Sequence, residues 1–493
     1  MDGSKVRCPA IGRGASNLRE LNLIRGEPPC SPLRVAHRSF SRVNSHRYPN
    51  SHVFYRKLGY EYPKIVRGEG CWLIDERGKR YLDAVGGAYV ANLGHSNPHI
   101  ADSIAEQCRQ FGYLSGTMFT HGPVENLADE LAETLPGDLS KLYFLCSGSE
   151  AVEAALKLAR QYWVEQGRPS KHKIIALSPG YHGSTLLALS ASAREAHKAP
   201  FKPWLVDVHR IPASYPYRCE CGGRGPACPV CSAAVLEEAI EQLGADTVAA
   251  FIAEPVGGSS TGASTPRPDY FKRVREICDR HDVLFIADEV LVGVGRTGTW
   301  WAIEPYDVAP DIMTFGKGIS GGYAALSGIA AGQRIVDTIA EGSGSFVHAQ
   351  TFSHHPVSCA AGVATMRYLK KHKLVERCAQ MGRVLHDRIR LLGDLPHVGD
   401  VRGRGLLAGI EFVEDKSSRS PFPRSLKFAE RFADAALDAG LTVWPNVGHA
   451  DGVNGDLVMV APPFIITEQE IAEIVGRFTM ALAKTTASLS VRA

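Results

Sequence analysis

Short, almost continuously apolar runs alternate with stretches of helical periodicity from about residue 51 onwards. Such runs are typical of strands buried on both faces of a sheet, and they stand at residues 141–146, 173–177, 247–253 and 283–287. Between the first two, residues 151–163 repeat apolar side chains at intervals of three and four, which predicts a helix. Strands separated by helices in this way predict an α/β domain with a largely parallel sheet.

The pattern changes towards the C-terminus. It predicts a long helical region around residues 356–393, a second helix over about 423–439, and apolar stretches at 402–412 and 457–464. Because strands and helices are fewer and more mixed here, we expect a separate, smaller α+β domain. The predicted division is a leader at 1–50, an N-terminal part of the small domain at 51–95, a large domain at 96–375 and the rest of the small domain at 376–493.

The composition is that of an ordinary globular protein, with 44% hydrophobic and 22% charged residues among 493. The net charge of +3 lacks the basic excess of a nucleic-acid-binding surface. No apolar run approaches the ~18 residues that suggest a membrane span. We therefore expect neither a nucleic-acid partner nor a membrane segment.

Residues 1–50 differ from the rest, with nine Lys and Arg against three acidic residues and many Ser and Pro. Organellar transit peptides have such a composition, but a clear amphipathic stripe is lacking, so a disordered leader or an over-long reading frame fits equally. We expect this segment to be non-structural. The expected location is the cytoplasm, or an organelle matrix if the segment is a transit peptide.

Four of the twelve cysteines are crowded into C-E-C-G-G-R-G-P-A-C-P-V-C, at Cys219, Cys221, Cys228 and Cys231. Two close pairs joined by a Gly/Pro-rich loop suit tetrahedral thiolate ligation of zinc or, less often, an iron–sulfur cluster; reduced cysteines and a disulfide knot are the alternatives. Apart from Glu220, the loop has no other ligand that would leave an open position, so a catalytic metal is not expected. The other eight cysteines are scattered singly, which favours a reducing compartment.

Candidate chemistry follows the predicted strands, where open α/β sheets carry their functional loops. After residues 141–146, Ser147 and Glu150 fit a capping box, and Gly148 lets the backbone approach an anion. An ordinary helix start explains that pattern equally well. After residues 173–177, Tyr181 and His182 stand on a glycine-flanked turn, where the tyrosine ring could stack on a flat ligand.

Acidic residues end the next two strands, Glu254 in A-E-P-V and Asp288 in A-D-E-V. Each could serve a ligand or pair with a nearby base. Lys317 follows in G-K-G, and a lysine whose pKa is lowered is a nucleophile towards carbonyls, with its glycines leaving space for a planar ring. An anion cradle, a flat-ring stacker, an acid for a ring nitrogen and a reactive lysine are together the parts that hold pyridoxal phosphate.

Eight stretches, in this order, resemble the class III pyridoxal-phosphate-dependent aminotransferases: S-G-S-E-A, Y-H-G, A-E-P-V, A-D-E-V, G-V-G-R-T-G, P-D-I-M-T-F-G-K-G, T-F-S-H-H-P and V-R-G-R-G-L-L-A-G-I-E-F. The resemblance covers about residues 53–485. It implies fold type I, with a large domain around a mostly parallel seven-stranded sheet flanked by helices and a smaller α+β domain from both termini. It also implies a homodimer with active sites at the subunit interface.

The resemblance implies roles for the residues of these motifs. Lys317 would form the Schiff base and move the substrate proton, and Asp288 would keep the pyridine nitrogen protonated. The other implied cofactor contacts are Val290 opposite Tyr181 on the ring, Glu254 and His182 beside Asp288, Ser147, Gly148 and Ser149 at the phosphate, and Thr351 from the other subunit. Tyr89 would line the substrate pocket, and Arg402 would grip a substrate carboxylate.

Two departures from the family pattern stand out. His354 occupies a position where relatives usually carry glycine, at the phosphate edge. The stretch 451–464 has no arginine, whereas relatives that turn over simple amines often have a mobile one there. This weakens an assignment to simple amine transamination.

The implied function is transfer of an amino group from an amino acid or ω-amino compound to a 2-oxo acid, pyruvate or 2-oxoglutarate, by a ping-pong mechanism. The same fold also supports racemases, aminomutases and decarboxylases, and the sequence does not show which bond breaks. A nicotinamide-binding interpretation of G-V-G-R-T-G is disfavoured because no helix is predicted after it. A non-catalytic metal-binding scaffold would leave Lys317 and Asp288 without a purpose.

Overall fold

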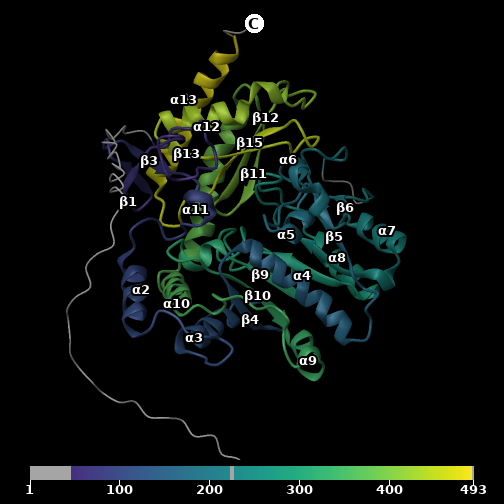
Figure 1. The fold of residues 1–493 in the computed structure, drawn as a ribbon. Coiled ribbons are helices and arrows are strands. Elements are labelled where there is room, and N and C mark those ends of the chain that lie inside the picture. The colour runs from purple at the N-terminus through teal and green to yellow at the C-terminus, as the bar shows by residue number, and fades with distance from the viewer. Residues whose placement is uncertain (1–45, 223–226, 491–493) are drawn as a thin grey trace, which may run out of the picture. The chain divides into compact units, whose positions relative to one another are not determined.

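The computed structural model describes residues 46–222 and 227–490 (Figure 1). Contacts within the chain separate the residues up to Tyr62 from those that follow, which gives two units. In the first, residues 46–62 contain turns but no described helix or strand, and the rings of Tyr55 and Tyr62 stack with centroids 4.6 Å apart. The predicted leader falls mainly on residues 1–45, which lie outside the described residues, so it stays a prediction.

The second unit is built around a seven-stranded sheet with the order β4-β10-β9-β8-β7-β5-β6. β10 is antiparallel to both neighbours and the other pairs are parallel, which confirms the largely parallel sheet. The four predicted strands are β4 (Leu139–Leu145), β5 (Lys173–Ser178), β7 (Val248–Ala253) and β8 (Leu284–Asp288). The others, too short or too rich in small residues to predict, are β6 (His209–Pro212), β9 (Ile312–Phe315) and β10 (Ser327–Gly332).

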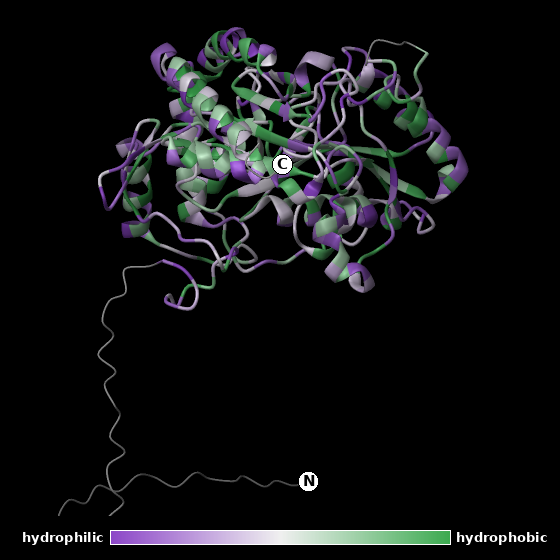
Figure 2. Ribbon diagram, turned by 90° about the horizontal axis from the view of Figure 1, so that it is seen from above, coloured by the Kyte–Doolittle hydropathy of each residue, from purple (hydrophilic) through white to green (hydrophobic). Residues whose placement is uncertain are grey.

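Both faces of this sheet are buried, as the continuous apolar runs predict. In β7, Phe251 and Ala253 belong to one core cluster, whereas Ala250 and Ile252 belong to another on the opposite face. Figure 2 shows the same arrangement, with hydrophobic colour along the strands and mixed colours on the surrounding helices. The sheet is therefore the middle layer between two layers of helices.

The predicted helix at 151–163 is the central part of α4 (Gly148–Glu165), which packs across β10, β9 and β7. On the other face, α10 (Pro356–Lys371) packs against α2 (Pro98–Gln110) and α3 (Gly122–Ala132). The remaining helices of this part are α5 (Leu186–Ala191), α6 (Glu195–Lys198), α7 (Ala234–Leu243), α8 (Tyr270–Arg280) and α9 (Gln333–Glu341), with short 3-10 turns at Ala199–Trp204, Ala245–Thr247, Glu304–Tyr306 and Lys317–Ser320.

Two four-stranded sheets form the smaller α+β part. In one, β1 (Ile65–Glu69), β2 (Trp72–Asp75) and β3 (Arg80–Asp83) are antiparallel, and β13 (Leu441–Thr442) joins β3 in parallel, so both ends of the chain contribute. The second is antiparallel, in the order β11 (Val398–Arg404), β12 (Leu407–Phe412), β15 (Asp456–Val460) and β14 (Trp444–Val447). The domain boundaries at 96 and 376 stay predictions.

The long helical region expected at 356–393 is two helices, α10 and α11 (Leu374–Ile389), followed by a 3-10 turn at Arg390–Asp394. The apolar pattern did not predict the break between these two helices, because its cause is the backbone geometry at one residue. Lys373 has a positive φ of 48°, which no continuous helix contains. The other elements are α1 (Gly86–Tyr89), a 3-10 turn at Arg424–Leu426, α12 (Phe428–Asp438) and α13 (Glu468–Ser490). Among the described helices, none is both long and apolar enough to cross a membrane.

Candidate active site

The ends of five strands bring the predicted residues to one edge of the large sheet. β5, β7, β8 and β9 are mutually parallel, and β4 runs in the same direction because the antiparallel β10 separates it from β9. Their carboxyl ends therefore meet at the same edge. The residues that follow are Ser147, Tyr181, Glu254, Asp288 and Lys317.

Lys317 follows β9 in a strained backbone conformation, with a φ of 46°. Its Nζ lies 5.1 Å from the ring centroid of Tyr89. Burial lowers the pKa of the amine to about 8, and the charges of Asp288 and Glu254 oppose that shift only in part. Among the described residues, none forms a hydrogen bond or ion pair with this amine.

Lys171 provides an internal comparison, because burial lowers its pKa to about 8 as well. Its Nζ, however, donates to the carbonyl oxygens of Ala245, Val248 and Asp282 at 2.6–3.0 Å. Lys171 is thus a structural lysine with its donors in use. Lys317 has a similar pKa and an amine that remains available for a ligand.

The glycines beside Lys317 serve a different purpose from the one expected. A Cβ on Gly318 would lie 2.1 Å from Nδ2 of Asn92, and one on Gly316 would lie 3.4 Å from Val290. Asn92 is itself held by Arg296, whose guanidinium donates to its Oδ1. The space beside the lysine is therefore filled by protein atoms rather than left for a cofactor ring.

Asp288 is buried at the end of β8 and its two carboxylate oxygens have separate partners. Oδ2 lies 2.7 Å from Nδ1 of His182, and Oδ1 accepts from the Thr314 hydroxyl at 3.0 Å and the Val290 amide at 3.1 Å. Burial alone would lower the pKa of His182, but the hydrogen bond and the charge of Asp288 raise it. The hydrogen bond to His182 thus holds the Asp288 carboxylate in a fixed orientation.

Glu254, after β7, lies close enough to act electrostatically on Lys317 and His182. Its carboxylate accepts from the Gly258 amide at 2.9 Å, the Ser260 hydroxyl at 3.2 Å and the Tyr181 amide at 3.3 Å. Burial raises the pKa of this carboxyl. Glu254 thereby orders both the turn that carries Tyr181 and the loop that leads towards residue 264.

The predicted capping box begins α4. Ser147 Oγ accepts from the Glu150 amide at 3.3 Å, while the Glu150 carboxylate accepts from the Ser147 amide at 2.8 Å. The Ser149 hydroxyl accepts from the Ser184 amide at 2.9 Å. Because the first amides of a helix have no intrahelical acceptor, Gly148 and Ser149 offer donors to an anion at this edge.

Tyr181 lies on the turn after β5, and the Arg194 guanidinium carbon stands 4.8 Å from its ring centroid. Arg194 also donates to the Ser259 hydroxyl at 2.6 Å, and its charge acts on Lys317 and Tyr89. Sequence reasoning missed Arg194, which belongs to no motif. It also missed Thr314, although a lone hydroxyl in an apolar strand beside G-K-G was a usable signal.

Tyr89 lies in the strained turn at the end of α1, with a φ of 65°. The side chain is buried, its ring centroid is 5.9 Å from that of Trp444, and its hydroxyl has no hydrogen-bond partner among the described residues. A buried hydroxyl without a partner is unfavourable unless a ligand supplies one. Its place beside Lys317 agrees with the expected substrate-side position.

Thr351 and His354 lie in the turn before α10. Thr351 is exposed and lies next to Phe352, whose side chain is also exposed. His354 has a φ of 56°, in the left-handed region that favours glycine. Its ring packs 4.6 Å from that of Tyr143, so the histidine fills a structural position.

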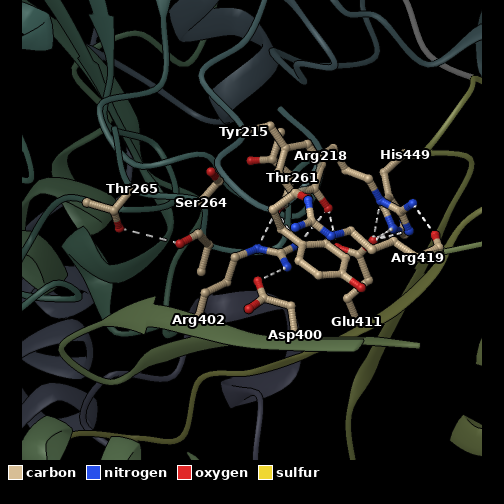
Figure 3. A network of polar contacts seen from close by, with 12 residues as sticks. Tyr215, Arg218, Thr261, Ser264, Thr265, Asp400, Arg402, Glu411, Arg419 and His449 are labelled. Carbon is tan, nitrogen blue, oxygen red and sulfur yellow. Dashed lines mark hydrogen bonds and ion pairs between the residues drawn. The ribbon is translucent and has the colours of Figure 1, made fainter. Parts of the chain in front are cut away.

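Arg402 lies on β11 and is fully engaged by protein groups, as Figure 3 shows. It donates to Asp400 and to the Thr261 carbonyl oxygen, each at 2.7 Å, and to the Tyr215 hydroxyl at 2.7 Å. Glu411 is 2.8 Å away and also contacts Arg218 and His449. The nearby positive charges lower the pKa of the buried Glu411 carboxyl, although burial alone would raise it.

A cavity of about 790 Å³ opens beside this network. Asp400, Arg402 and Arg419 line one side, and residues of the cysteine loop, Tyr217 and Cys221 among them, line the other. Lys317 and Asp288 are not part of its lining. The predicted carboxylate-binding arginine therefore faces a space next to the cysteine loop.

The G-V-G-R-T-G stretch forms turns, with positive φ at Gly295 and Gly298. Arg296 is buried within it and donates to the carbonyl oxygens of Leu406 and Pro462 at 3.0 and 2.7 Å. No described helix begins at its end, so the nicotinamide-binding interpretation fails. Through Arg296, the motif instead contacts Asn92, which lies beside Gly318, as well as the backbone of Leu406 and Pro462 next to the smaller antiparallel sheet.

The residues at the strand ends fit pyridoxal phosphate. The available amine of Lys317, the oriented carboxylate of Asp288 and the amides at the start of α4 supply a nucleophile, an acceptor for a ring N–H and an anion site. Each comes from a different strand end, as expected for a ligand bound at the edge of an α/β sheet.

Comparisons with known proteins agree with this geometry. The family model "Aminotransferase class-III" matches residues 58–482. An uncharacterised aminotransferase of Schizosaccharomyces pombe is 38% identical over 442 residues, covering 89% of this chain and 96% of that protein. A diaminobutyrate–2-oxoglutarate transaminase of Halomonas elongata is 35% identical over 436 residues, covering 86% and 91%.

Among solved structures, the ω-transaminase of Pseudomonas jessenii in complex with PMP has a TM-score of 0.81 and 32% identity, covering 88% of this chain and 94% of that one. The non-catalytic scaffold interpretation is therefore wrong, because the chain matches enzymes over almost its whole described length. The chain belongs to the class III aminotransferases, fold type I enzymes that use pyridoxal phosphate.

Proposed function

We propose that this enzyme moves an amino group from an amino acid or ω-amino compound to a 2-oxo acid, with pyridoxal phosphate held at Lys317. The observation that carries the proposal is the partly buried Lys317 amine, which has a pKa lowered to about 8 and no hydrogen-bond partner among the described residues. The relative from Halomonas elongata is a diaminobutyrate–2-oxoglutarate transaminase, which supports 2-oxoglutarate as an acceptor. A ping-pong sequence follows, because one site serves donor and acceptor in turn.

Each residue has a distinct task in this proposal. Pyridoxal phosphate supplies an electron sink for negative charge that develops at the substrate α-carbon. Lys317 would hold the carbonyl carbon of the cofactor and, when the donor amine displaces it, take the proton from that α-carbon as general base. Asp288 would accept the pyridine N–H, while His182 and Thr314 keep its carboxylate in place.

The remaining cofactor contacts follow from the same edge of the sheet. Ser147, Gly148 and Ser149 would bind the phosphate through the start of α4, and Val290 and Tyr181 would enclose the ring. The Arg194 guanidinium lies over one face of the Tyr181 ring, so Arg194 would be a neighbour of the cofactor ring. Racemase, aminomutase and decarboxylase chemistry are the alternatives on this fold. They differ from transamination because the donor does not convert the bound cofactor stoichiometrically to its pyridoxamine form.

The protein is also proposed to be a homodimer, with Thr351 reaching the phosphate site of the partner. Support comes from apolar side chains around Thr351 that are 50–76% exposed, namely Tyr113, Met118, Phe119, Val347 and Phe352. The rings of Tyr113 and Phe352 are 5.9 Å apart, so the two segments form one patch. A continuous apolar patch of this kind is typical of a protein interface.

Arg402 is proposed to bind a substrate carboxylate from the side of the cavity. The Asp400 side chain is 28% exposed, so a ligand carboxylate could take its place on the guanidinium with little rearrangement. Arg194 is the rival position, because its charge acts directly on Lys317. Small-molecule donor and acceptor are the partners in either case.

We infer a cytoplasmic location because the eight cysteines outside residues 219–231 are scattered singly, which favours a reducing compartment. Fractionation of cells that produce the full chain tests this, and recovery in an organelle matrix would favour the transit-peptide interpretation of residues 1–50.

The absorption spectrum of the purified enzyme tests the reaction class. On adding an amino donor without acceptor, the visible band of bound pyridoxal phosphate should convert to the pyridoxamine form, and a 2-oxo acid should restore it. If the enzyme forms product without this conversion of its visible band, the racemase, mutase or decarboxylase alternatives are favoured.

Covalent trapping identifies the lysine. Borohydride reduction followed by peptide mass mapping should place the cofactor on Lys317 and leave the matched buried lysine, Lys171, unmodified. Lys317→Ala should abolish turnover while the phosphate-side contacts still retain cofactor without a covalent link. Labelling of Lys171, or an active Lys317→Ala enzyme, would end the proposal.

The rate at which the apoenzyme takes up pyridoxal phosphate should rise with pH, with a midpoint near pH 8. Only the neutral amine attacks a carbonyl, and Lys317 loses its proton about two pH units earlier than an ordinary lysine.

The unfolding free energy of the apoprotein should also rise between pH 8 and 10.5, because the unfolded chain there binds a proton that the folded chain has released. Lys171 should contribute a comparable rise, so Lys317→Met should remove only the share of the increase that belongs to Lys317; an unchanged slope contradicts the assignment.

Phe119→Glu should shift the protein from dimer to monomer in light scattering and lower cofactor retention, because the charge would be buried in the proposed interface. Met480→Glu, an equally exposed apolar position on α13, is the control and should leave the mass unchanged. Thr351→Ala should weaken cofactor binding in an intact dimer. A monomeric, fully active wild-type enzyme would contradict the interface.

Arg402→Lys should raise the KM for the 2-oxo acid about tenfold with little change in the cofactor spectrum, since lysine keeps the charge and loses the bidentate contact. Arg194→Met is the matched variant. If only Arg194→Met raises that KM, Arg194 binds the carboxylate and Arg402 has a purely structural role.

A further inference from the structure

Four thiol sulfurs meet in the loop between β6 and α7. The Cys219 Sγ lies 3.2 Å from that of Cys221, 3.7 Å from that of Cys228 and 3.6 Å from that of Cys231. The Cys221 and Cys231 sulfurs are 3.3 Å apart, and all four lie within 4.8 Å of one another. Four sulfurs at about 2.3 Å from a tetrahedral zinc ion stand about 3.8 Å from each other.

These distances decide among the alternatives raised by the sequence. A disulfide brings two sulfurs to about 2.0 Å, whereas the sulfur–sulfur distances given above are 3.2 Å or longer. In an iron–sulfur cluster each iron takes its own thiolates, which spreads the ligands around several metal ions. Here all four sulfurs lie within 4.8 Å of one another, which is the arrangement for a single ion.

The backbone holds each pair in a tight turn. The Gly222 amide donates to the Cys219 carbonyl oxygen at 2.9 Å, and the Ser232 amide donates to that of Cys228 at 2.9 Å. Cys231 is buried and the other three cysteines are partly buried. Four thiolates would complete the coordination of the ion, so the site is closed and structural rather than catalytic.

The loop has no regular secondary structure of its own among the described residues. Within 213–222 and 227–233 there is no described helix or strand, and its backbone contacts are mostly local turns. A small irregular segment of this kind gains its folding free energy from a metal more readily than from an apolar core.

The first cysteine is directly tied to the Arg402 network. The Cys219 amide donates to the Tyr215 carbonyl oxygen at 2.8 Å, and the Tyr215 hydroxyl contacts both Glu411 and Arg402. Arg218, one residue before Cys219, donates to Glu411 at 2.7 Å. Figure 3 shows Tyr215 and Arg218 reaching towards Glu411 and Arg402.

We propose that Cys219, Cys221, Cys228 and Cys231 bind one structural zinc ion, and that this ion fixes the loop that holds Tyr215 and Arg218 against Arg402 and Glu411. The metal site stands on the sulfur geometry alone. Its consequence for substrate binding rests on the proposed function, in which Arg402 contacts the substrate carboxylate.

Metal analysis of the full-length enzyme, purified without a metal-binding tag from zinc-supplemented cells, tests the site. One equivalent of zinc per chain is expected in the wild type and in Cys108→Ser, which changes an exposed cysteine outside the loop. Cys228→Ser should lose the metal. Cobalt-substituted wild type should show the absorption of tetrahedral cobalt bound by thiolates, which keeps the test valid if a serine variant fails to fold.

Three results would overturn the metal site: absence of zinc together with no cobalt uptake, iron with acid-labile sulfide, or thiol titration of the denatured wild type showing paired cysteines. The link to the substrate is read separately. Cys228→Ser should raise the KM for the 2-oxo acid several-fold with an unchanged cofactor spectrum. If the wild type holds zinc and Cys228→Ser loses it without a change in KM, the metal site stands and only its coupling to Arg402 is overturned.

Discussion

Burying an amine without a hydrogen bond costs free energy, and the fold around Lys317 is arranged to sustain that cost. A shift of the pKa from 10.5 to about 8 corresponds to about 3 kcal/mol at neutral pH. The large core on both faces of the central sheet can tolerate such an amount. Lys171 shows the ordinary alternative, in which a buried ammonium is satisfied by three carbonyl oxygens. The difference between these lysines is the difference between a structural and a chemical role.

The neighbours of Lys317 are fixed so that its amine is the part left to react. Asn92 occupies the space beside Gly318 and is held by Arg296, while Asp288 is held by His182 and Thr314. These contacts come from residues that already have their own partners, so the site is preorganised before a ligand arrives. A catalytic geometry that needs no rearrangement loses less binding energy to ordering.

The local parts of this site are predictable from sequence because their causes are local. The Ser147 capping box depends on residues three apart, and the acids at Glu254 and Asp288 follow apolar runs that can only be buried strands. The purpose of Gly318 is different: its constraint is Asn92, more than two hundred residues earlier in the chain. Arg402 likewise sits in a recognisable motif that also holds its partner Glu411, yet its other partners, Tyr215 and Thr261, are more than a hundred residues away in the sequence. Pairing between such residues is a property of the tertiary fold.

One segment joins the two polar networks. Glu254 accepts from Gly258 and Ser260 near its start, and the Thr261 carbonyl oxygen accepts from Arg402 near its end. A Cβ on Gly262 would lie 2.8 Å from the Arg402 guanidinium, so even this backbone is in close contact with that side chain. A displacement of Arg402 by a ligand carboxylate would therefore act on the loop that Glu254 orders, and Glu254 in turn orders the turn of Tyr181. The Arg402 network and the residues around Lys317 are in this way joined through about ten residues of backbone. If Arg402 binds the substrate carboxylate as proposed, this segment is the physical route by which the cysteine loop would act on the reaction without touching it.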